Sequence, residues 1–449
     1  MKKLSLKQTI SVASMLFGMF FGAGNLIFPV HLGQLAGAHM WGAALGFIVT
    51  GVGIPILAVA AIGNTHSSGL QDLSSRLGKG YGLVFTCVLM LTIGPFFAIP
   101  RCATVSYTTG VEALLGENIN GTLALLIFTL CFFALVLYFS LKPGKILTII
   151  GKIINPLFLF FLAVLLITAL VQPSVAVSAV SPDATYESGA FFNGFLEGYN
   201  TMDAIAGLAF GIVVIEVIRS LGIDDNSAVA ANTLRSGLFA GLLMALIYLL
   251  TILVGAQSRG LFELSENGGI ALAQIARHYL GGLGSLVLAL TITIACLKTS
   301  IALVTSCSET FSRMFPGRLS YRTWAIIFST FSFAVSNVGL NTIITWTVPV
   351  LMLLYPLTIS LVALALTGRL FDHDRRVYLC VTVGAFIAAV FDFLNALPVE
   401  AVWIDAPVRL ASRILPFFDF GLGWICPCLL GLLVGLLLRA IGKKTNRVI

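Results

Sequence analysis

Charged residues are scarce in this chain. Asp, Glu, Lys and Arg make up 10% of its 449 residues, whereas hydrophobic residues make up 58%. Because soluble globular domains carry about 25% charged residues, this composition excludes a soluble globular protein. It indicates a protein that crosses a lipid bilayer several times.

The chain also lacks the motifs of common enzymes. It contains no Gly-x-x-x-x-Gly-Lys phosphate loop, no Gly-x-Ser-x-Gly and no His-Glu-x-x-His. Its five histidines show no metal-ligand spacing, and its eight cysteines all fall within predicted spans, where we expect them to be packing residues. No basic patch with interleaved aromatic residues is present. We therefore expect no enzymatic activity, no cofactor other than a bound Na⁺, and no nucleic-acid partner.

Long hydrophobic runs, in contrast, are abundant. A membrane-spanning helix needs roughly 20 apolar residues, and about twelve stretches qualify: 8–36, 40–62, 81–111, 122–141, 146–171, 203–221, 237–256, 283–311, 321–339, 343–366, 377–396 and 417–438. If these stretches cross the membrane in turn, most of the 26 Lys and Arg residues lie on the same side as the N-terminus. Cytoplasmic loops hold this excess, so both termini are predicted to be cytoplasmic, and the net charge of +7 reflects membrane orientation.

The first hydrophobic stretch is interrupted near its middle. Residues 18–29 read Gly-Met-Phe-Phe-Gly-Ala-Gly-Asn-Leu-Ile-Phe-Pro. Glycine and proline are the poorest helix formers, and proline removes a helical hydrogen bond. The released backbone groups cannot face lipid, and broken helices at mid-membrane are typical of secondary transporters. We interpret the segment as a break at a binding site; the alternative is a simple proline kink in which Asn25 bonds to a neighbouring helix.

The sixth stretch contains a second glycine-rich segment, Ala206-Gly207-Leu208-Ala209-Phe210-Gly211. Taken alone, its two glycines favour close helix packing. Their position favours a second break, because spans 1–5 and 6–10 would form two halves of opposite orientation, each opening with an interrupted helix. This predicts one transmembrane domain over residues 1–449, with repeats at about 8–171 and 203–366 and two peripheral helices at about 377–438. Residues 190–202 are expected to form a short interfacial helix before the sixth span.

Five segments spread over nearly the whole chain are distinctive. They are Phe21–Pro29, Gly94–Arg101 with Ala103–Ser106, Gly198–Asp203 followed by Phe210–Val213, Ala295–Leu297 leading to Ser306–Glu309, and Ser336–Leu340. These segments resemble those of the branched-chain amino acid carriers, the leucine/isoleucine/valine:cation symporters. The resemblance implies the five-plus-five inverted-repeat fold of sodium-coupled amino-acid transporters: an all-α architecture with ten core helices, of which helices 1 and 6 are broken, and two peripheral helices.

The first break has the polarity that a zwitterionic amino acid requires. The N-terminus of a half-helix offers free N–H groups and a partial positive charge to a carboxylate, while freed carbonyl groups suit a cation. By the resemblance, the substrate site consists of Ala23, Gly24, Asn25, Ala206, Gly207, Leu208, Ala209, Phe210 and Gly211, with Phe210 shaping the apolar pocket. A Na⁺ site would use Gly18, Phe21, Ala295, Thr299 and Ser300. The alternative for Thr299 and Ser300 is ordinary hydrogen bonding between helices.

Two cationic side chains lie within predicted spans, where a charge is costly and functional by default. Lys298 falls in the predicted cation site, at a point where the related sodium-coupled transporters have an oxygen-bearing residue, so its ammonium group would replace Na⁺ or exchange a proton. The alternative is a lysine that snorkels or pairs with Glu216 or Glu309. Arg101 is a candidate gate residue that could pair with Asp203, Glu216 or a substrate carboxylate; the alternative is an arginine that simply reaches the membrane interface. We assign no further role to Asp203.

Together these features predict a secondary symporter that imports branched-chain amino acids across a bacterial-type cytoplasmic membrane by alternating access. A gradient of Na⁺ or H⁺ would drive transport. The alternatives are an importer of another apolar amino acid such as methionine, a channel, and an intramembrane enzyme acting on lipids. Accumulation of leucine against its gradient distinguishes these classes.

Overall fold

The computed structural model describes residues 3–65, 67, 69–112, 120–141, 155–399 and 401–445. Within these ranges the chain forms helices and no strand, and every predicted span contains at least one helix. Eight helices in this part of the chain are long and apolar enough to cross a membrane, and Phe158–Val171 is a shorter apolar helix. The predicted all-helical membrane architecture is therefore confirmed, while the division into two repeats stays a prediction.

The first span is a broken helix, as its glycines predict. Helix α1 spans Leu6–Phe20 and α2 spans Gly24–Ala36, and residues 21–23 between them are not helical. A capping box begins α1: the backbone N–H of Gln8 donates to Ser5 Oγ at 3.2 Å, and the N–H of Ser5 donates to Gln8 Oε1 at 2.9 Å.

The other helices up to residue 171 follow in order. They are η1 (Gly37–His39), α3 (Met40–Ile48), the π-helical turn η2 (Val49–Gly53), α4 (Ile54–Asn64), α5 (Leu70–Ser74), α6 (Lys79–Leu91), the π-helical turns η3 (Thr92–Phe96) and η4 (Tyr107–Val111) with α7 (Ala98–Ser106) between them, α8 (Gly121–Ser140) and α10 (Asn155–Val171). The part of the predicted fifth span before residue 155 lies outside the described residues. The third span bends at Gly94, whose φ of −94° and ψ of −122° are not helical. This bend lies just before α7, the helix that carries the buried Arg101.

The remaining helices complete the chain. They are η7 (Val177–Ala179), α11 (Ala184–Glu187), α12 (Ala190–Glu197), η8 (Gly198–Thr201), α13 (Asp203–Ser220), α14 (Asn226–Ser258), α15 (Gly268–Met314), α16 (Tyr321–Ser336), α17 (Leu340–Thr367), η9 (Gly368–Phe371), α18 (Arg375–Asn395), α19 (Val402–Ile414), η10 (Phe418–Phe420) and α20 (Ile425–Thr445). Helix α14 begins well before the predicted residue 237 because Asp225 caps it, accepting from Ala228 N–H at 2.7 Å. Helix α20 begins later than the predicted residue 417 because Phe417 and Gly421 both have a φ of 64°.

The sixth span is broken at a different place from the one predicted. Helix α13 is continuous from Asp203 to Ser220, so the predicted interruption within Ala206–Gly211 is wrong. The break lies at Met202, whose φ of 61° and ψ of 12° separate α13 from η8. Residues 190–202 therefore form the first half of the broken helix.

The two glycines of α13 have a packing role. A Cβ atom at Gly207 would lie 2.7 Å from the carbonyl oxygen of Pro55, and one at Gly211 would lie 2.9 Å from Ile62 Cγ1. Pro55 and Ile62 both belong to α4, which packs closely along α13. Small residues allow this approach of two helices, as the first of the two interpretations of these glycines predicted.

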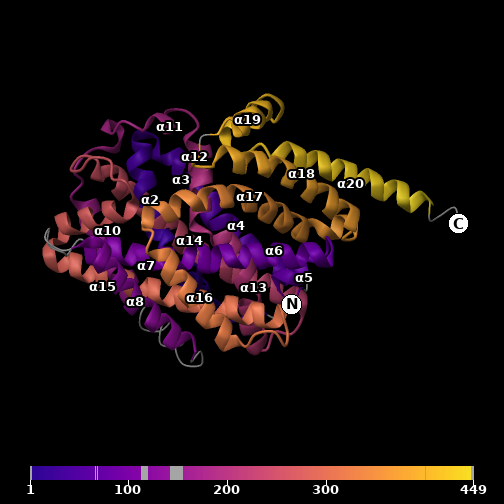
Figure 1. The fold of residues 1–449 in the computed structure, drawn as a ribbon, viewed down its shortest axis with the longest axis horizontal. Coiled ribbons are helices and arrows are strands. Elements are labelled where there is room, and N and C mark those ends of the chain that lie inside the picture. The colour runs from indigo at the N-terminus through magenta and orange to yellow at the C-terminus, as the bar shows by residue number, and fades with distance from the viewer. Residues whose placement is uncertain are drawn as a thin grey trace.

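Helix α14 lies among the helices that form the two breaks. It packs against α1, α2 and α4 (Figure 1). At its crossing with α2, a Cβ atom at Gly33 would lie 2.8 Å from the backbone nitrogen of Ala256, and one at Gly255 would lie 2.9 Å from the carbonyl carbon of Val30. These two glycines let the helix backbones touch, which fixes α14 against the half-helix that follows the first break.

The last helices lie at the edge of the molecule. Helices α18 and α20 run side by side and extend away from the remainder of the bundle, and α18 contacts α17 (Figure 1). Helix α19, between them in sequence, lies at the end of this pair that is closer to the rest of the bundle (Figure 1). It exposes much of its apolar surface, including Val402 and Trp403. This arrangement agrees with the two peripheral helices expected from the sequence.

Candidate functional site

The break in the first helix is stabilised by Asn25. The backbone N–H of Gly22 donates to Asn25 Oδ1 at 2.8 Å, so it is not available to the carbonyl group of Gly18, its partner in a continuous helix. Ala23 precedes α2 without a side-chain cap. The N–H group of Leu26 donates to the carbonyl oxygen of Ala23 at 3.2 Å. The N–H groups of Gly24 and Asn25 therefore remain available to an anion, which a helix N-terminus favours.

The same asparagine joins the two broken helices. Its Nδ2 donates to Asp203 Oδ2 at 2.5 Å and also to the hydroxyl group of Tyr248 on α14. That hydroxyl group donates to Asp203 Oδ2 at 3.2 Å. All three side chains are buried. The network thus holds one carboxylate oxygen of Asp203 between α2 and α14.

The second break places Asp203 at the first position of α13. Thr201 Oγ1 donates to the carbonyl oxygen of Gly198 at 2.9 Å and accepts from the N–H of Asp203 at 3.4 Å. Between them, Met202 has a left-handed conformation that costs a residue with a side chain about 1–3 kcal/mol. Conformations of this kind concentrate at functional sites, and here the turn directs Asp203 toward the first break.

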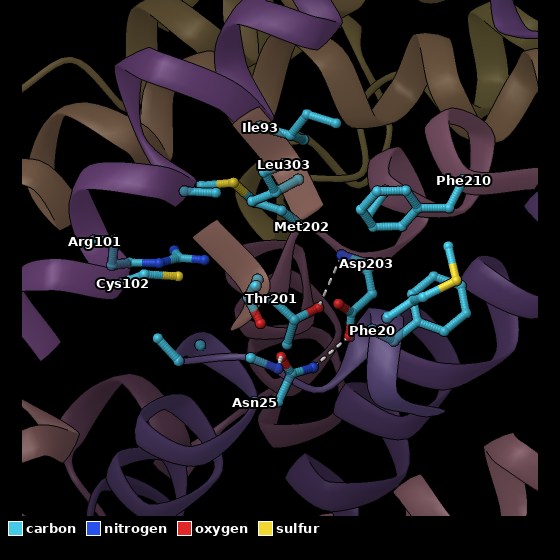
Figure 2. Close-up of a pocket in the computed structure, with 17 residues that line it drawn as sticks. Phe20, Asn25, Ile93, Arg101, Cys102, Thr201, Met202, Asp203, Phe210 and Leu303 are labelled. Carbon is cyan, nitrogen blue, oxygen red and sulfur yellow. Dashed lines mark hydrogen bonds between the residues drawn. The ribbon is translucent and has the colours of Figure 1, made fainter. Parts of the chain in front are cut away.

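A cavity lies between the two breaks. It is lined by Met19, Phe20, Gly22, Ala23, Gly24, Asn25, Ile93, Ala98, Arg101, Cys102, Thr201, Met202, Asp203, Ala206, Phe210, Thr299 and Leu303. Figure 2 shows that the polar groups are segregated from the apolar ones: Asn25, Thr201 and Asp203 face one part of the cavity, whereas Ile93, Leu303 and Phe210 surround another. The cavity therefore matches a ligand with a polar and an apolar end.

Arg101 enters this cavity from α7. The side chain is 3% exposed, and its Nε and Nη1 atoms are buried without a hydrogen-bond partner among the described residues. Its guanidinium carbon lies 5.0 Å from the ring centre of Phe28, close enough for a cation–π interaction. A Cβ atom at Gly24 would lie 2.9 Å from Arg101 Nη2. Glycine at position 24 thus leaves room for the guanidinium group beside the start of α2.

The structure brings some of the predicted substrate residues together and leaves others apart. Ala23, Gly24, Asn25, Ala206 and Phe210 line the cavity, as does Arg101. Gly207, Leu208, Ala209 and Gly211 do not line it. Because α13 is a regular helix here, only the face that holds Ala206 and Phe210, four residues apart, points to the cavity.

The predicted cation residues are also divided. Thr299 lines the cavity and packs on the first break, with Oγ1 3.3 Å from a Cβ atom placed at Gly22. Its hydroxyl group donates to the carbonyl oxygen of Ala295 at 3.2 Å. The others do not line the cavity, although all are buried: Gly18, Phe21, Ala295, Lys298 and Ser300. No group of three or more His, Cys, Asp or Glu residues suited to a metal ion occurs among the described residues.

Several residues of the site were not identified from the sequence. Asp203, Thr201, Met202 and Cys102 line the cavity, and Tyr248 orients Asp203 from α14. Asp203 offered a usable signal, because an ionisable residue at the start of an apolar span is a functional candidate by default. Tyr248 offered none, since it lies within an ordinary apolar helix.

Known proteins share both the sequence and the fold. The family model described as branched-chain amino acid transport protein matches residues 5–441. The branched-chain amino acid permease BrnQ of Lactobacillus delbrueckii subsp. lactis is 52% identical over 95% of this chain and 95% of its own length. BrnQ of Bacillus subtilis (strain 168) is 40% identical over 99% of this chain and all of its own length, 100%.

Two solved transporters share the fold at low sequence identity. Mhp1, a nucleobase-cation-symport-1 family transporter in a closed conformation, matches with a TM-score of 0.62 at 14% identity, over 97% of this chain and 93% of its own. MhsT in complex with L-phenylalanine matches with a TM-score of 0.57 at 15% identity, over 97% and 99% of the two chains. These likenesses agree with the predicted transporter fold.

Proposed function

Because this chain belongs to the family of branched-chain amino acid transport proteins, we propose that it imports leucine, isoleucine and valine as a secondary symporter. Its relatives in Lactobacillus delbrueckii and Bacillus subtilis are named branched-chain amino acid permeases. Import places the chain in the cytoplasmic membrane, with both termini in the cytoplasm as the Lys and Arg distribution predicts.

The observation that supports this function is the cavity between the two broken helices. Secondary transporters bind their substrate near mid-membrane where discontinuous helices expose backbone groups. Here the start of α2 offers N–H groups, and Asp203 begins α13 on the same cavity. An amino acid held there would be released as one group of helices rocks against the rest.

The apolar part of the cavity suits a branched aliphatic side chain. Phe20, Ile93, Phe210 and Leu303 contribute its surface. A single methylene group in such a pocket is worth only about 1–3 kcal/mol, so leucine, isoleucine and valine are expected to share the site. Methionine also suits this pocket. Competition between these amino acids in uptake assays ranks their affinities.

A Na⁺ or H⁺ gradient is the proposed driving force. For Na⁺, the carbonyl group of Gly18 and the hydroxyl group of Thr299 flank the first break, and oxygen atoms of these kinds are suitable ligands. For H⁺, the buried Lys298 is the candidate exchanging group, since lysine adjusts its proton affinity readily when buried. The two possibilities predict different behaviour in the same assay.

Uptake of labelled leucine into proteoliposomes, with Na⁺ and H⁺ gradients imposed separately, tests the proposal. Accumulation above the external concentration that an ionophore abolishes is expected; equilibration without accumulation would indicate a channel and overturn it. If Na⁺ is coupled, Thr299→Ala should raise the Na⁺ concentration for half-maximal uptake. If H⁺ is coupled, Lys298→Ala should abolish the response to a pH gradient while Thr299→Ala keeps it.

A further inference from the structure

Two buried side chains of opposite charge face the same cavity without touching. Arg101 points into it from α7, and Asp203 lies across it at the start of α13 (Figure 2). Their exposed fractions are 3% and 2%. The ion pair between Arg439 and Asp372 lies elsewhere. Arg101 and Asp203 are therefore separated by the cavity itself.

Such an arrangement is costly unless something else satisfies both charges. Removing a charge from water without a partner carries a penalty of several kcal/mol, and two nitrogen atoms of Arg101 lack any partner among the described residues. A direct ion pair would relieve this cost but would fill the cavity. A zwitterion placed between the two groups relieves it and leaves each protein group in its position.

We propose that Arg101 binds the carboxylate of the substrate and that Asp203 binds its α-ammonium group. This inference rests on the proposed function and extends it, because it assigns the two charged contacts that select an α-amino acid over other small apolar molecules. The guanidinium group can form two parallel hydrogen bonds to a carboxylate, a geometry that lysine cannot reproduce.

The surroundings of each group agree with its assignment. Arg101 Nη2 lies beside Gly24, so a carboxylate at Arg101 also meets the uncapped start of α2. On the other side, Asn25 and Tyr248 both donate to Asp203 Oδ2, which fixes the carboxylate and leaves Oδ1 as the oxygen that these donors do not use. The apolar residues Phe210, Ile93 and Leu303 then receive the aliphatic side chain.

Three ligands separate the two contacts in the purified full-length protein. Leucine has both charges, leucinol keeps the ammonium group and lacks the carboxylate, and 4-methylpentanoate keeps the carboxylate and lacks the ammonium group. The dissociation constant of each ligand is measured from the thermal stabilisation that it produces. The same measurement serves for variants that bind leucine weakly. The ratio of the leucinol constant to the leucine constant measures recognition of the carboxylate.

Arg101→Gln is expected to weaken leucine binding about 30-fold or more, the usual effect of truncating one partner of a buried charged pair. Leucinol binding should change little, so the ratio of the two constants falls toward one. Asp203→Asn should weaken leucine and leucinol by similar factors and leave their ratio unchanged. Arg101→Lys, which keeps the charge but not the paired geometry, should give an intermediate ratio.

Arg277→Gln, an exposed arginine outside the cavity, is the matched control and should retain the unmodified constants. A leucinol-to-leucine ratio that stays high in Arg101→Gln would overturn the inference, as would equal weakening of both ligands. If Arg101→Gln does not fold, the intermediate ratio expected of Arg101→Lys decides the question alone. Failure of the unmodified protein to transport leucine would instead overturn the proposed function.

Discussion

Replacing Gly207 with alanine tests whether the glycines of α13 pack against a neighbour or form a break. A Cβ atom at this position would lie 2.7 Å from the carbonyl oxygen of Pro55 and 3.1 Å from the Cβ atom of Ala58, whereas ordinary contacts begin at 3.4 Å. The closer neighbour is a backbone atom, which cannot rotate away. Helices α13 and α4 must therefore separate locally by about 0.7 Å, the difference between the 2.7 Å contact and the 3.4 Å of an ordinary one.

The change in folding stability caused by Gly207→Ala follows from two opposing effects. Overfilling a packed interface typically costs 1–3 kcal/mol, while alanine is about 1 kcal/mol better than glycine inside a helix. Gly63→Ala on α4 provides a matched control, since its Cβ atom would meet Ala230 at an ordinary 3.4 Å. Both variants gain helix propensity, so Gly207→Ala should be less stable than Gly63→Ala by about 1–3 kcal/mol, or on the order of a few degrees in Tm.

Thermal unfolding in detergent and the KM for leucine uptake together give a decisive assay. Gly207 does not line the cavity, so Gly207→Ala should lower Tm relative to Gly63→Ala while the KM stays within about twofold of the unmodified value, less than the tenfold that 1.4 kcal/mol of binding would give. Equal Tm values for both variants, with a KM raised tenfold or more by Gly207→Ala, would refute the packing interpretation and restore the broken-helix interpretation of this segment.

Two further changes have definite expected outcomes. Asn25→Ala removes the acceptor for the N–H of Gly22 and a donor to Asp203. Each buried group left without a partner costs about 1–3 kcal/mol, so both Tm and leucine affinity should fall. An unchanged affinity would contradict the role of this network. Asp372→Asn removes the ion pair with Arg439, in which Asp372 is 66% exposed. Because exposed pairs contribute about 0–1 kcal/mol, Tm and uptake should stay nearly unchanged. A large loss of either would show that this contact between α20 and the turn before α18 matters more than its exposure indicates.

The two breaks differ in how far local sequence specifies them. Gly22, Gly24 and Pro29 all weaken a helix at one place, and the structure ends α1 and begins α2 there. At the second break the left-handed residue is Met202, which has no intrinsic preference for that conformation. The contacts of η8 and α13 impose it, so no local pattern marks it.

The glycine cluster at 206–211 shows why composition alone was misleading. Glycine weakens a helix, but it also permits close helix crossing. Which effect applies depends on what lies opposite, and only the position of Pro55 and Ile62 on α4 shows that the cluster packs. The face of α13 that meets the cavity, with Ala206 and Phe210, was likewise set by how the helix rotates against α4.

The sequence by itself determined the class of this protein: an all-helical membrane transporter with a broken first helix, because scarce charge, long apolar runs and helix-breaking residues act locally and leave few alternatives. It also singled out Arg101 and Lys298 as costly intramembrane charges. Only the tertiary structure decided that Arg101 faces Asp203 across one cavity while Lys298 lies outside its lining. The reason is physical: the burial cost of a charge depends on its own surroundings, but its partner is chosen by the packing of helices that are distant in sequence.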